Sequence, residues 1–215
     1  MDDPHLNAPV LQAGVPLKQA SAALILLHGR GATADSILDL ANYIGHDGFA
    51  YLAPQANGNT WYPYSFLEPI ANNEPWLTSA LRCVNRVVAS VLKAGLSREK
   101  VAIAGFSQGA CLTMEYGVRL PHRYGALLGL SGGMIGPPGT KWGAEKPKSL
   151  SDTPAFVGCS DVDPHIPLER VHETVAVLKA LGAEVIEQIY PGMGHTINED
   201  EMKRCKALLR KLTDS

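Results

Sequence analysis

Short, wholly apolar runs that alternate with helical patterns constrain the fold of this chain more than any other feature. The clearest runs cover residues 22–27, 101–105 and 126–130. A run of this kind, without polar residues at alternate positions, is typical of a strand buried on both faces of a parallel sheet. Between the runs, apolar residues recur three and four positions apart, as in residues 76–92. This alternation predicts parallel strands joined by right-handed helical crossovers.

The same patterns place the remaining elements and indicate one domain over residues 1–215. Residues 132–151, rich in Gly, Pro and Lys, are expected to form a surface excursion. The chain has no repeat or obvious linker, and its 215 residues, 46% of them hydrophobic, suffice for one core. The predicted fold class is α/β, an open, mostly parallel sheet flanked by helices. Further strands are predicted at 49–53, 155–158 and 184–190, an edge strand within 10–17, and helices at 34–44, 76–92, 110–120, 168–181 and 198–212.

Charge and cysteine spacing exclude several classes of protein. The formal net charge is −2, so no basic field points to nucleic acid or to acidic lipid. The longest apolar run is far too short to span a bilayer, and the acidic start lacks the apolar stretch of a signal peptide. No two of the four cysteines form a C-x-x-C metal or redox motif. We therefore expect a soluble, cytoplasmic protein with reduced thiols and no stable membrane insertion, and the sequence leaves a homodimer open.

The strand predicted at 101–105 ends in the sequence G-F-S-Q-G, which runs from Gly105 to Gly109. Between a strand and a helix, G-x-S-x-G is the pattern of a sharp turn that exposes a serine hydroxyl at the edge of the sheet. The glycines leave room for the turn, and the helix N-terminus favours negative charge that forms nearby. The pattern predicts Ser107 as a nucleophile. The alternative is a Gly-rich strand exit with a capping serine.

A serine hydroxyl is a poor nucleophile until a base accepts its proton, and hydrolases of this topology keep the chain order Ser, acid, His. Four histidines follow Ser107. His122 lies in a helix-to-strand connector, and His172 falls inside the helix predicted at 168–181. His195 ends the sequence Y-P-G-M-G-H directly after the last predicted strand, in a loop able to reach over the strand edge. We predict His195 as the general base.

The acid is expected after the strand at 155–158, where the sequence offers Asp161 and Asp163. Its role is to accept the imidazole N–H, fix the tautomer and stabilise the imidazolium. Asp163, held before Pro164 and ahead of a helix entry, is our prediction, and Asp161 remains the alternative. Asp161, Asp163 and His165 also alternate as D-x-D-x-H, but the chain offers no further ligand cluster, so we predict no metal.

Acyl transfer also needs donors for the oxyanion. The backbone N–H of Gln108, the residue after the nucleophile, is the first predicted donor. The second is the backbone N–H of Arg30, in the H-G-x-G loop after the first buried strand. We expect His28 of this loop to be a structural hydrogen-bonding residue. The side chain of Arg30 has two interpretations: a solvated arginine, or a cation at the mouth of the site that attracts an acidic substrate group.

Four of the fourteen aromatic residues lie within residues 61–66, after the second buried strand and thus on the side of the predicted site. We predict that Trp61, Tyr64 and Phe66 bind substrate as part of an acyl or alcohol pocket. An equally weighted alternative is a hydrophobic loop folded onto the body of the protein. Residues 134–142 are expected to supply the opposite wall, and no insertion is long enough for a cap domain.

Together, these motifs resemble the phospholipase/carboxylesterase family of α/β-hydrolases, which includes acyl-protein thioesterases and small bacterial carboxylesterases. The resemblance runs from about residue 22 to residue 212. It implies the α/β-hydrolase fold, and its D-P-x-[VI]-P pattern supports Asp163 over Asp161 as the acid. It also implies the roles given above to Ser107 and His195, and to the amides of Arg30 and Gln108.

Two departures from the acyl-protein thioesterase pattern concern the substrate. Those enzymes usually carry a small or apolar residue where this chain has Arg30, and an Asp where it has Ala32. Their W-F-D segment is replaced here by residues 60–66. The prediction is therefore a serine carboxylesterase that acts on small or medium esters without a cofactor. The alternatives are a thioesterase, a lysophospholipase-type or other hydrolase with the same triad, and, more remotely, a non-catalytic binding module.

Overall fold

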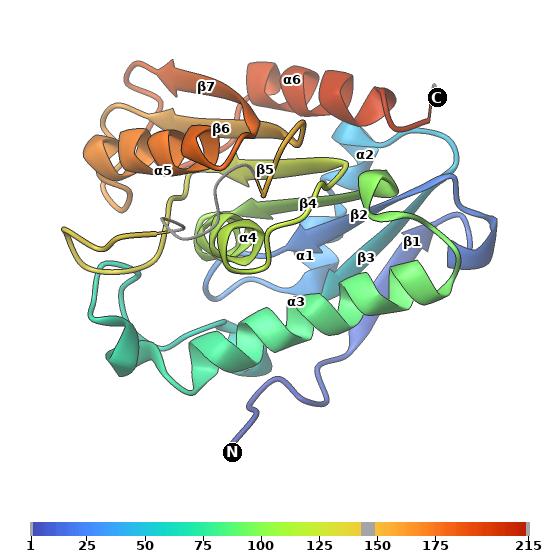
Figure 1. The fold of residues 1–215 in the computed structure, drawn as a ribbon, viewed down its shortest axis with the longest axis horizontal. Helices are drawn as coiled ribbons and strands as arrows, with labels where there is room; N and C mark the ends of the chain where they lie inside the picture. Colours follow the sequence, from blue (N-terminus) through green and yellow to red (C-terminus); the bar gives the residue numbers. More distant parts are fainter. Residues whose placement is uncertain (1, 143–148, 214–215) are drawn as a thin grey trace.

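The computed structural model describes residues 2–142 and 149–213, and these residues form one seven-stranded sheet with the order β1-β3-β2-β4-β5-β6-β7. β1 pairs with β3 in antiparallel fashion, and all other neighbouring strands are parallel (Figure 1). The mostly parallel open sheet and its antiparallel edge strand confirm the predicted architecture. The strands are β1 (Val10–Gly14), β2 (Ala22–Leu27), β3 (Phe49–Pro54), β4 (Val101–Phe106), β5 (Ala126–Leu130), β6 (Pro154–Ser160) and β7 (Glu184–Tyr190).

Helices cover both faces of this sheet. The side chains of Ala23, Ile25 and Leu27 share one apolar core with α3 (Trp76–Lys93), α4 (Gln108–Arg119) and α5 (Leu168–Ala180). The alternate residues of β2 share the other core with α1 (Ala34–Leu38), α2 (Ala41–Ile44) and α6 (Glu199–Arg210). Two covered faces explain why β2 is wholly apolar and fully buried. Short 3-10 helices lie at Leu17–Gln19, Asn57–Asn59, Ile70–Asn73 and Arg98–Lys100.

The helix predicted at residues 34–44 is divided into α1 and α2. A hydrogen bond from the backbone N–H of Leu40 to the carbonyl of Ile37 tightens the last turn of α1 to a 3-10 geometry. Ile37 and Ile44 are buried in the core, whereas Tyr43 between them is largely exposed. The apolar residues of this stretch therefore belong to two short helices, each of which packs separately against the core.

Part of the stretch predicted as a surface excursion, residues 132–151, is buried instead. Residues 132–136 are buried, and Met134 and Ile135 belong to the core. The reason is that buried side chains satisfy their backbone groups: the Arg170 guanidinium donates to the carbonyl of Met134, and Glu115 accepts from the N–H of Ile135. Residues 143–148 of the predicted excursion lie outside the described residues.

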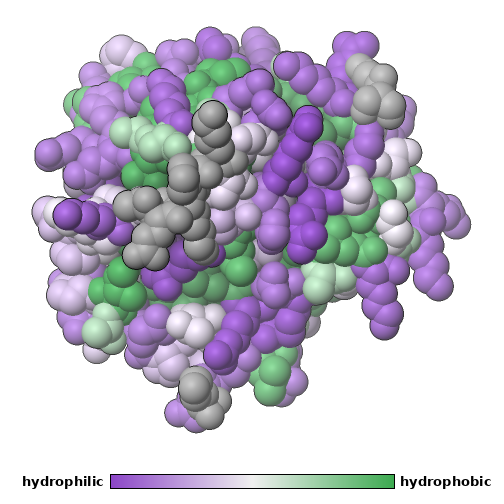
Figure 2. Space-filling model, in the orientation of Figure 1, coloured by the Kyte–Doolittle hydropathy of each residue, from purple (hydrophilic) through white to green (hydrophobic). Residues whose placement is uncertain are grey.

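Within the described chain, no helix combines the length and the apolar character needed to cross a bilayer. The face shown in Figure 2 is largely hydrophilic, with separate hydrophobic areas between the polar side chains. All four cysteines are buried free thiols.

Glu201 is a buried carboxylate whose ionisation should oppose folding. It lies in the first turn of α6 and packs against β6, where a side chain on Gly158 would clash with its Oε1 atom. Its Oε2 atom accepts the N–H of Asn198, while Oε1 has no hydrogen-bond partner among the described residues. Burial raises the pKa of the Glu201 carboxyl to about 7, from an ordinary value of 4.5. The native state therefore holds a proton that the unfolded chain has released between these two pH values, so stability falls as the pH rises through this range.

We expect Glu201→Gln to remove this part of the pH dependence, which amounts to as much as about 3 kcal/mol between pH 5 and pH 8. Urea unfolding of both proteins at several pH values measures the difference, and comparison with the wild type cancels the contributions of other titrating groups. Glu199→Gln, at a side chain that is 94% exposed on the same helix, is the matched control. A Glu201→Gln variant with the pH dependence of the wild type would contradict the assignment.

Candidate active site

Ser107 stands on the sharp turn between β4 and α4, with φ 55° and ψ −120°, a left-handed conformation that is rare for a residue with a side chain. Glycines make the turn feasible. A Cβ atom on Gly105 would lie 2.3 Å from the backbone of Gly109, and one on Gly109 would lie 2.0 Å from the carbonyl oxygen of Leu27. The turn thus fits tightly against β2, and it holds the Ser107 hydroxyl at the carboxyl edge of the sheet.

Loops that follow β4, β6 and β7 bring Ser107, Asp163 and His195 together. The Nε2 atom of His195 lies 2.9 Å from the Ser107 Oγ atom, and its Nδ1 atom lies 2.7 Å from the Oδ2 atom of Asp163. The Asp163 side chain is fully buried, and its Oδ1 atom accepts the backbone N–H groups of His165 and Ile166. With Nδ1–H donating to the carboxylate, Nε2 is free to accept the serine proton. The geometry is that of a general base beside a nucleophile.

Asp161, the alternative acid, lies elsewhere in the same loop system. Its Oδ1 atom accepts the backbone N–H of Gly192 at 2.8 Å, so it braces the loop that carries His195 without meeting the imidazole. The structure brings Asp163, and not Asp161, to His195.

Three neighbours of the triad escaped the motif analysis. The thiol of Cys159 lies 3.7 Å from the Asp163 Oδ2 atom, and burial, together with the charge of Asp163, raises the pKa of this thiol to about 12, so it stays protonated and donates. The His195 ring contacts the rings of Phe106 and His165, whose centroids lie 5.0 Å and 4.8 Å from its own. Phe106 lies inside the G-x-S-x-G motif and His165 inside D-P-x-[VI]-P, at positions that those patterns leave undefined.

The loop after β2 lies against Ser107, as predicted from its position in the chain. A Cβ atom on Gly29 would lie 3.4 Å from the Cβ atom of Ser107. Over the residues that the structure describes, the backbone N–H groups of Arg30 and Gln108 have no acceptor. Gln108 is the first residue of α4, where an N–H has no partner within the helix. Both amides are therefore available to an oxygen atom bound beside Ser107.

His28 and Arg30 have structural contacts in this loop. His28 is fully buried: its Nδ1–H donates to the carbonyl of Gly29, and its Nε2 atom accepts the N–H of Ala56. Burial lowers the pKa of its imidazole. This agrees with the structural role expected for it. The Arg30 guanidinium donates to the Thr60 hydroxyl and to the carbonyls of Pro63 and Tyr64, an arrangement that neither interpretation of the sequence foresaw.

The aromatic residues of 61–66 divide between the cleft and the core. Tyr64 and Phe66 line the cleft beside Ser107. Trp61 is fully buried and does not, because its indole N–H donates to the carbonyl of His28 and its ring packs on the His28 ring at 5.0 Å. The structure therefore does not bring Trp61 into the cleft with Tyr64 and Phe66.

The cleft has a volume of about 700 Å³, within the range of small-molecule sites. The lining of the cleft includes His165 and Ile166 and none of residues 134–142, which were predicted to supply its opposite wall. Among the residues that the structure describes, the lining includes one arginine, Arg30, and no Lys, Asp or Glu. The lining consists of Gly29, Arg30, Ala32, Pro63, Tyr64, Ser65, Phe66, Phe106, Ser107, Gln108, His165, Ile166 and His195.

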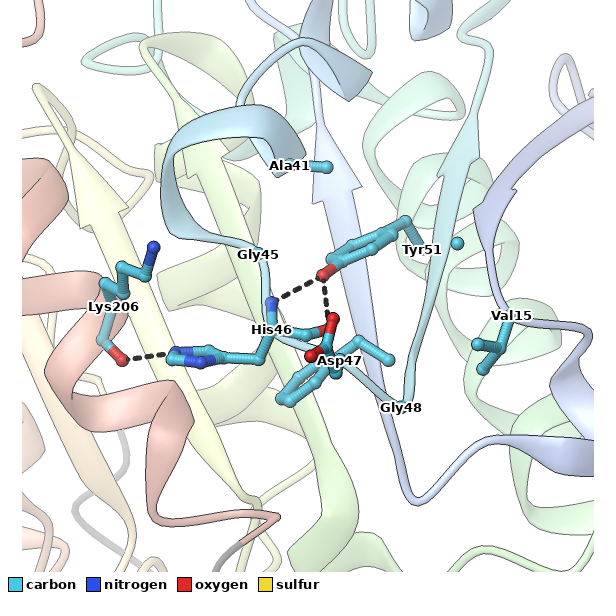
Figure 3. Close-up of a pocket in the computed structure, with 10 residues that line it drawn as sticks. Val15, Ala41, Gly45, His46, Asp47, Gly48, Tyr51 and Lys206 are labelled. Carbon is cyan, nitrogen blue, oxygen red and sulfur yellow. Dashed lines mark hydrogen bonds between the residues drawn. The ribbon is translucent and has the colours of Figure 1, made fainter.

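A second hollow, shown in Figure 3, lies at the opposite, amino end of β3. Its polar groups bind each other: the His46 ring bonds the carbonyl of Lys206, and the Tyr51 hydroxyl bonds the backbone of His46. The ring of His46 and the hydroxyl of Tyr51 are therefore already paired within the protein. In the described parts of the chain, no group of three or more His, Cys, Asp or Glu residues is arranged to hold a metal ion.

Comparison with known proteins agrees with this geometry. A family model described as Phospholipase/Carboxylesterase matches residues 12–213. The phospholipase/carboxylesterase structure from Dyadobacter fermentans is 41% identical, aligns over 95% of this chain and 97% of its own, and gives a TM-score of 0.90. Acyl-protein thioesterase 1 of Saccharomyces cerevisiae is 26% identical over 230 residues, which cover 95% of this chain and 99% of that protein. Acyl-protein thioesterase 1 of Gibberella zeae is 31% identical over 130 residues, which are 59% of this chain and 54% of that protein's length. Because the family model covers nearly the whole chain, the protein belongs to the phospholipase/carboxylesterase family of α/β-hydrolase enzymes.

Proposed function

We propose that the protein is a serine carboxylesterase that hydrolyses small or medium esters through an acyl-enzyme on Ser107. The observation that carries the proposal is the unbroken hydrogen-bond chain from Asp163 through His195 to the Ser107 hydroxyl, at the floor of a cleft. Two unoccupied backbone amides beside the hydroxyl complete the groups that acyl transfer requires.

The first half of the reaction forms the acyl-enzyme. The Ser107 oxygen attacks the ester carbonyl carbon while its proton passes to the Nε2 atom of His195. The carbonyl oxygen becomes an oxyanion, which accepts the N–H groups of Arg30 and Gln108. The tetrahedral intermediate then breaks its bond to the alcohol oxygen, which takes the proton from His195. Asp163 stays ionised throughout and stabilises the imidazolium.

The second half releases the acid. Water attacks the acyl carbon and gives a proton to His195, the same two amides hold the second oxyanion, and the bond to the Ser107 oxygen breaks. His195 returns its proton to that oxygen, and the carboxylic acid leaves. Every bond change is a proton or acyl transfer, so the chemistry needs no cofactor.

The cleft walls favour an ester with an apolar acyl or alcohol part. Tyr64, Phe66, Phe106 and Ile166 contribute aromatic and aliphatic surface to the lining of the cleft. The second candidate substrate class is acyl thioesters, which the names of the yeast and Gibberella relatives suggest. We favour oxyesters because the chain differs from the acyl-protein thioesterase pattern at Arg30 and in residues 60–66, both beside the cleft.

A matched substrate pair tests this choice. We expect kcat/KM for ethyl butyrate to equal or exceed that for S-ethyl thiobutyrate, which has the same acyl group and differs only in the leaving atom. A preference of more than tenfold for the thioester would assign the site to the second class. The Ser107→Ala variant, assayed in parallel, shows how much of each rate belongs to the site.

A further inference from the structure

The two positions at which the sequence departs from the acyl-protein thioesterase pattern contact each other. Arg30 stands on the loop after β2, and the replaced segment begins thirty residues later. The Nη1 atom of Arg30 donates to the Thr60 hydroxyl at 3.1 Å and to the carbonyl of Pro63 at 2.8 Å, and Nη2 donates to the carbonyl of Tyr64 at 2.7 Å. A planar guanidinium can hold several acceptors in one fixed geometry, which a lysine ammonium cannot do as well. We call residues 60–64 the clamp segment.

The side chain of Gln108 also binds the clamp segment. Its Oε1 atom accepts the N–H of Trp61 at 2.9 Å, and its Nε2 atom donates to the carbonyl of Tyr62 at 2.8 Å. Gln108, Trp61 and Tyr62 are all buried, so the bond from Trp61 satisfies an N–H that would otherwise be buried without a partner. The carbonyl of Tyr62 also accepts the Thr60 hydroxyl at 2.9 Å. The Thr60 hydroxyl lies at the junction, since it contacts both the Arg30 guanidinium and the Gln108 amide.

The clamp segment is itself fixed to the body of the protein. Trp61 and Tyr62 are buried, and the indole N–H of Trp61 donates to the carbonyl of His28. The N–H of Gly31 donates to the carbonyl of Asn59, directly before the segment. Because the segment is anchored at its centre and at one end, it can fix the position of Arg30 relative to that of Gln108.

We infer that the clamp segment, through the side chains of Arg30 and Gln108, sets the spacing of the two oxyanion donors. The inference rests on the proposed function, in which the backbone N–H groups of these same two residues hold the oxyanion. The donors belong to separate elements, the loop after β2 and the N-terminus of α4, so something must hold them in register. Oxyanion stabilisation depends on donor positions to within about 0.5 Å, and an error of 1 Å can cost about a hundredfold in rate. Arg30 and Thr60 are therefore positioning residues for the reaction.

The contacts of Arg30 favour this role over recognition of an anionic substrate. Three of its donor bonds go to a hydroxyl and to carbonyls of the clamp segment. Among the described residues, no carboxylate lies within 4.0 Å of its guanidinium. The guanidinium thus binds groups of the protein itself, and we expect its removal to lower the rate of hydrolysis of every ester, charged or neutral.

Arg30→Met tests the inference, because methionine keeps an extended side chain but donates no hydrogen bond. We expect kcat for a neutral ester, 4-nitrophenyl butyrate, to fall by roughly 10- to 100-fold with KM changed less than threefold, since a misplaced donor weakens only the transition state. The inhibition constant of a trifluoromethyl ketone, which forms a tetrahedral adduct, should rise in parallel with the loss in kcat/KM. Arg30→Lys should recover only part of the rate.

Thr60→Val keeps the shape of the side chain and removes the hydroxyl at the junction. It tests the same inference if Arg30→Met does not fold. We expect a smaller fall in kcat, about three- to tenfold, again with KM nearly unchanged, and Thr60→Ser should retain the wild-type rate. The matched control is Arg123→Met, which should leave kcat and KM unchanged. Arg123 is exposed and precedes the amino end of β5, whereas the cleft lies at the carboxyl ends of the strands.

Three results would overturn the inference while leaving the proposed function intact. The first is an unchanged kcat in both Arg30→Met and Thr60→Val. The second is a rise in KM alone, which indicates ordinary substrate binding. The third is a loss confined to an anionic ester, such as the hemisuccinate of 4-nitrophenol, which would make Arg30 a binding group for substrate charge. Failure of the proposed function has a separate signature, namely ester turnover that survives Ser107→Ala.

Discussion

Replacing Ser107 by alanine should lower kcat for 4-nitrophenyl butyrate by a factor on the order of 10⁵ to 10⁶. The substitution removes the only atom that forms the acyl-enzyme, and His195 then has no hydroxyl to deprotonate. Residual hydrolysis above the rate in water would come from the oxyanion amides and from substrate binding alone. Alanine carries a Cβ atom as serine does, so the left-handed turn at φ 55° is neither relieved nor worsened. Long incubations with highly purified variant are needed to measure so small a rate.

Ser90→Ala is the matched control for this variant. Ser90 lies on α3, and its hydroxyl donates to the carbonyl of Val87 within the same helix. We expect it to keep the wild-type kcat, and both variants should unfold in a cooperative thermal transition like the wild type. Retention of more than about 1% of kcat by a folded Ser107→Ala protein would show that another group attacks the ester.

Asp163→Asn should lower kcat by about 10⁴-fold, the second largest effect that we predict. An asparagine amide can present its NH₂ group to the Nδ1 atom of His195, which places the imidazole proton on Nε2 and leaves no lone pair to accept the serine proton. The site should keep its shape, because Asn retains an oxygen able to accept the N–H groups of His165 and Ile166. The measurement is kcat at a pH near 8, with thermal unfolding as the check on folding.

Asp161→Asn is the matched control, because Asp161 is the alternative acid that follows the same strand. An asparagine oxygen can still accept the N–H of Gly192, so we expect a change of no more than a few-fold in kcat. If Asp161→Asn were as damaging as Asp163→Asn, the assignment of the acid would have to be reversed.

The sheet could be predicted from the sequence because its signal is local. The limits of β2 and β5 coincide with apolar runs that a two-sided burial requires. That Ser107 and His195 lie close together could be predicted for a related reason: each is in the turn or loop that follows a recognisable strand, and the carboxyl ends of parallel strands meet at one edge. Choosing Asp163 over Asp161 needed the family pattern, since both residues follow the same strand.

The contacts that shape the cleft could not be predicted, because they join residues far apart in the chain. Whether Trp61 faces the cleft or the core depends on the carbonyl of His28, thirty-three positions earlier. Met134 and Ile135 lie in a Gly- and Pro-rich stretch typical of a surface loop, yet Arg170 and Glu115 satisfy their backbone and allow burial. The partners of the Arg30 guanidinium are likewise set by tertiary structure. Local composition carries no signal for any of these pairings.

Covalent labelling with a fluorophosphonate, followed by peptide mass spectrometry, tests the role of Ser107 most directly. The reagent reacts with a serine only when a base activates the hydroxyl and an oxyanion site receives the phosphoryl oxygen. We predict one adduct per chain, located on Ser107, with ester hydrolysis lost in proportion to labelling and no adduct on the Ser107→Ala variant. An adduct on another residue, or continued ester hydrolysis by fully labelled protein, would contradict the assignment of Ser107 as the nucleophile.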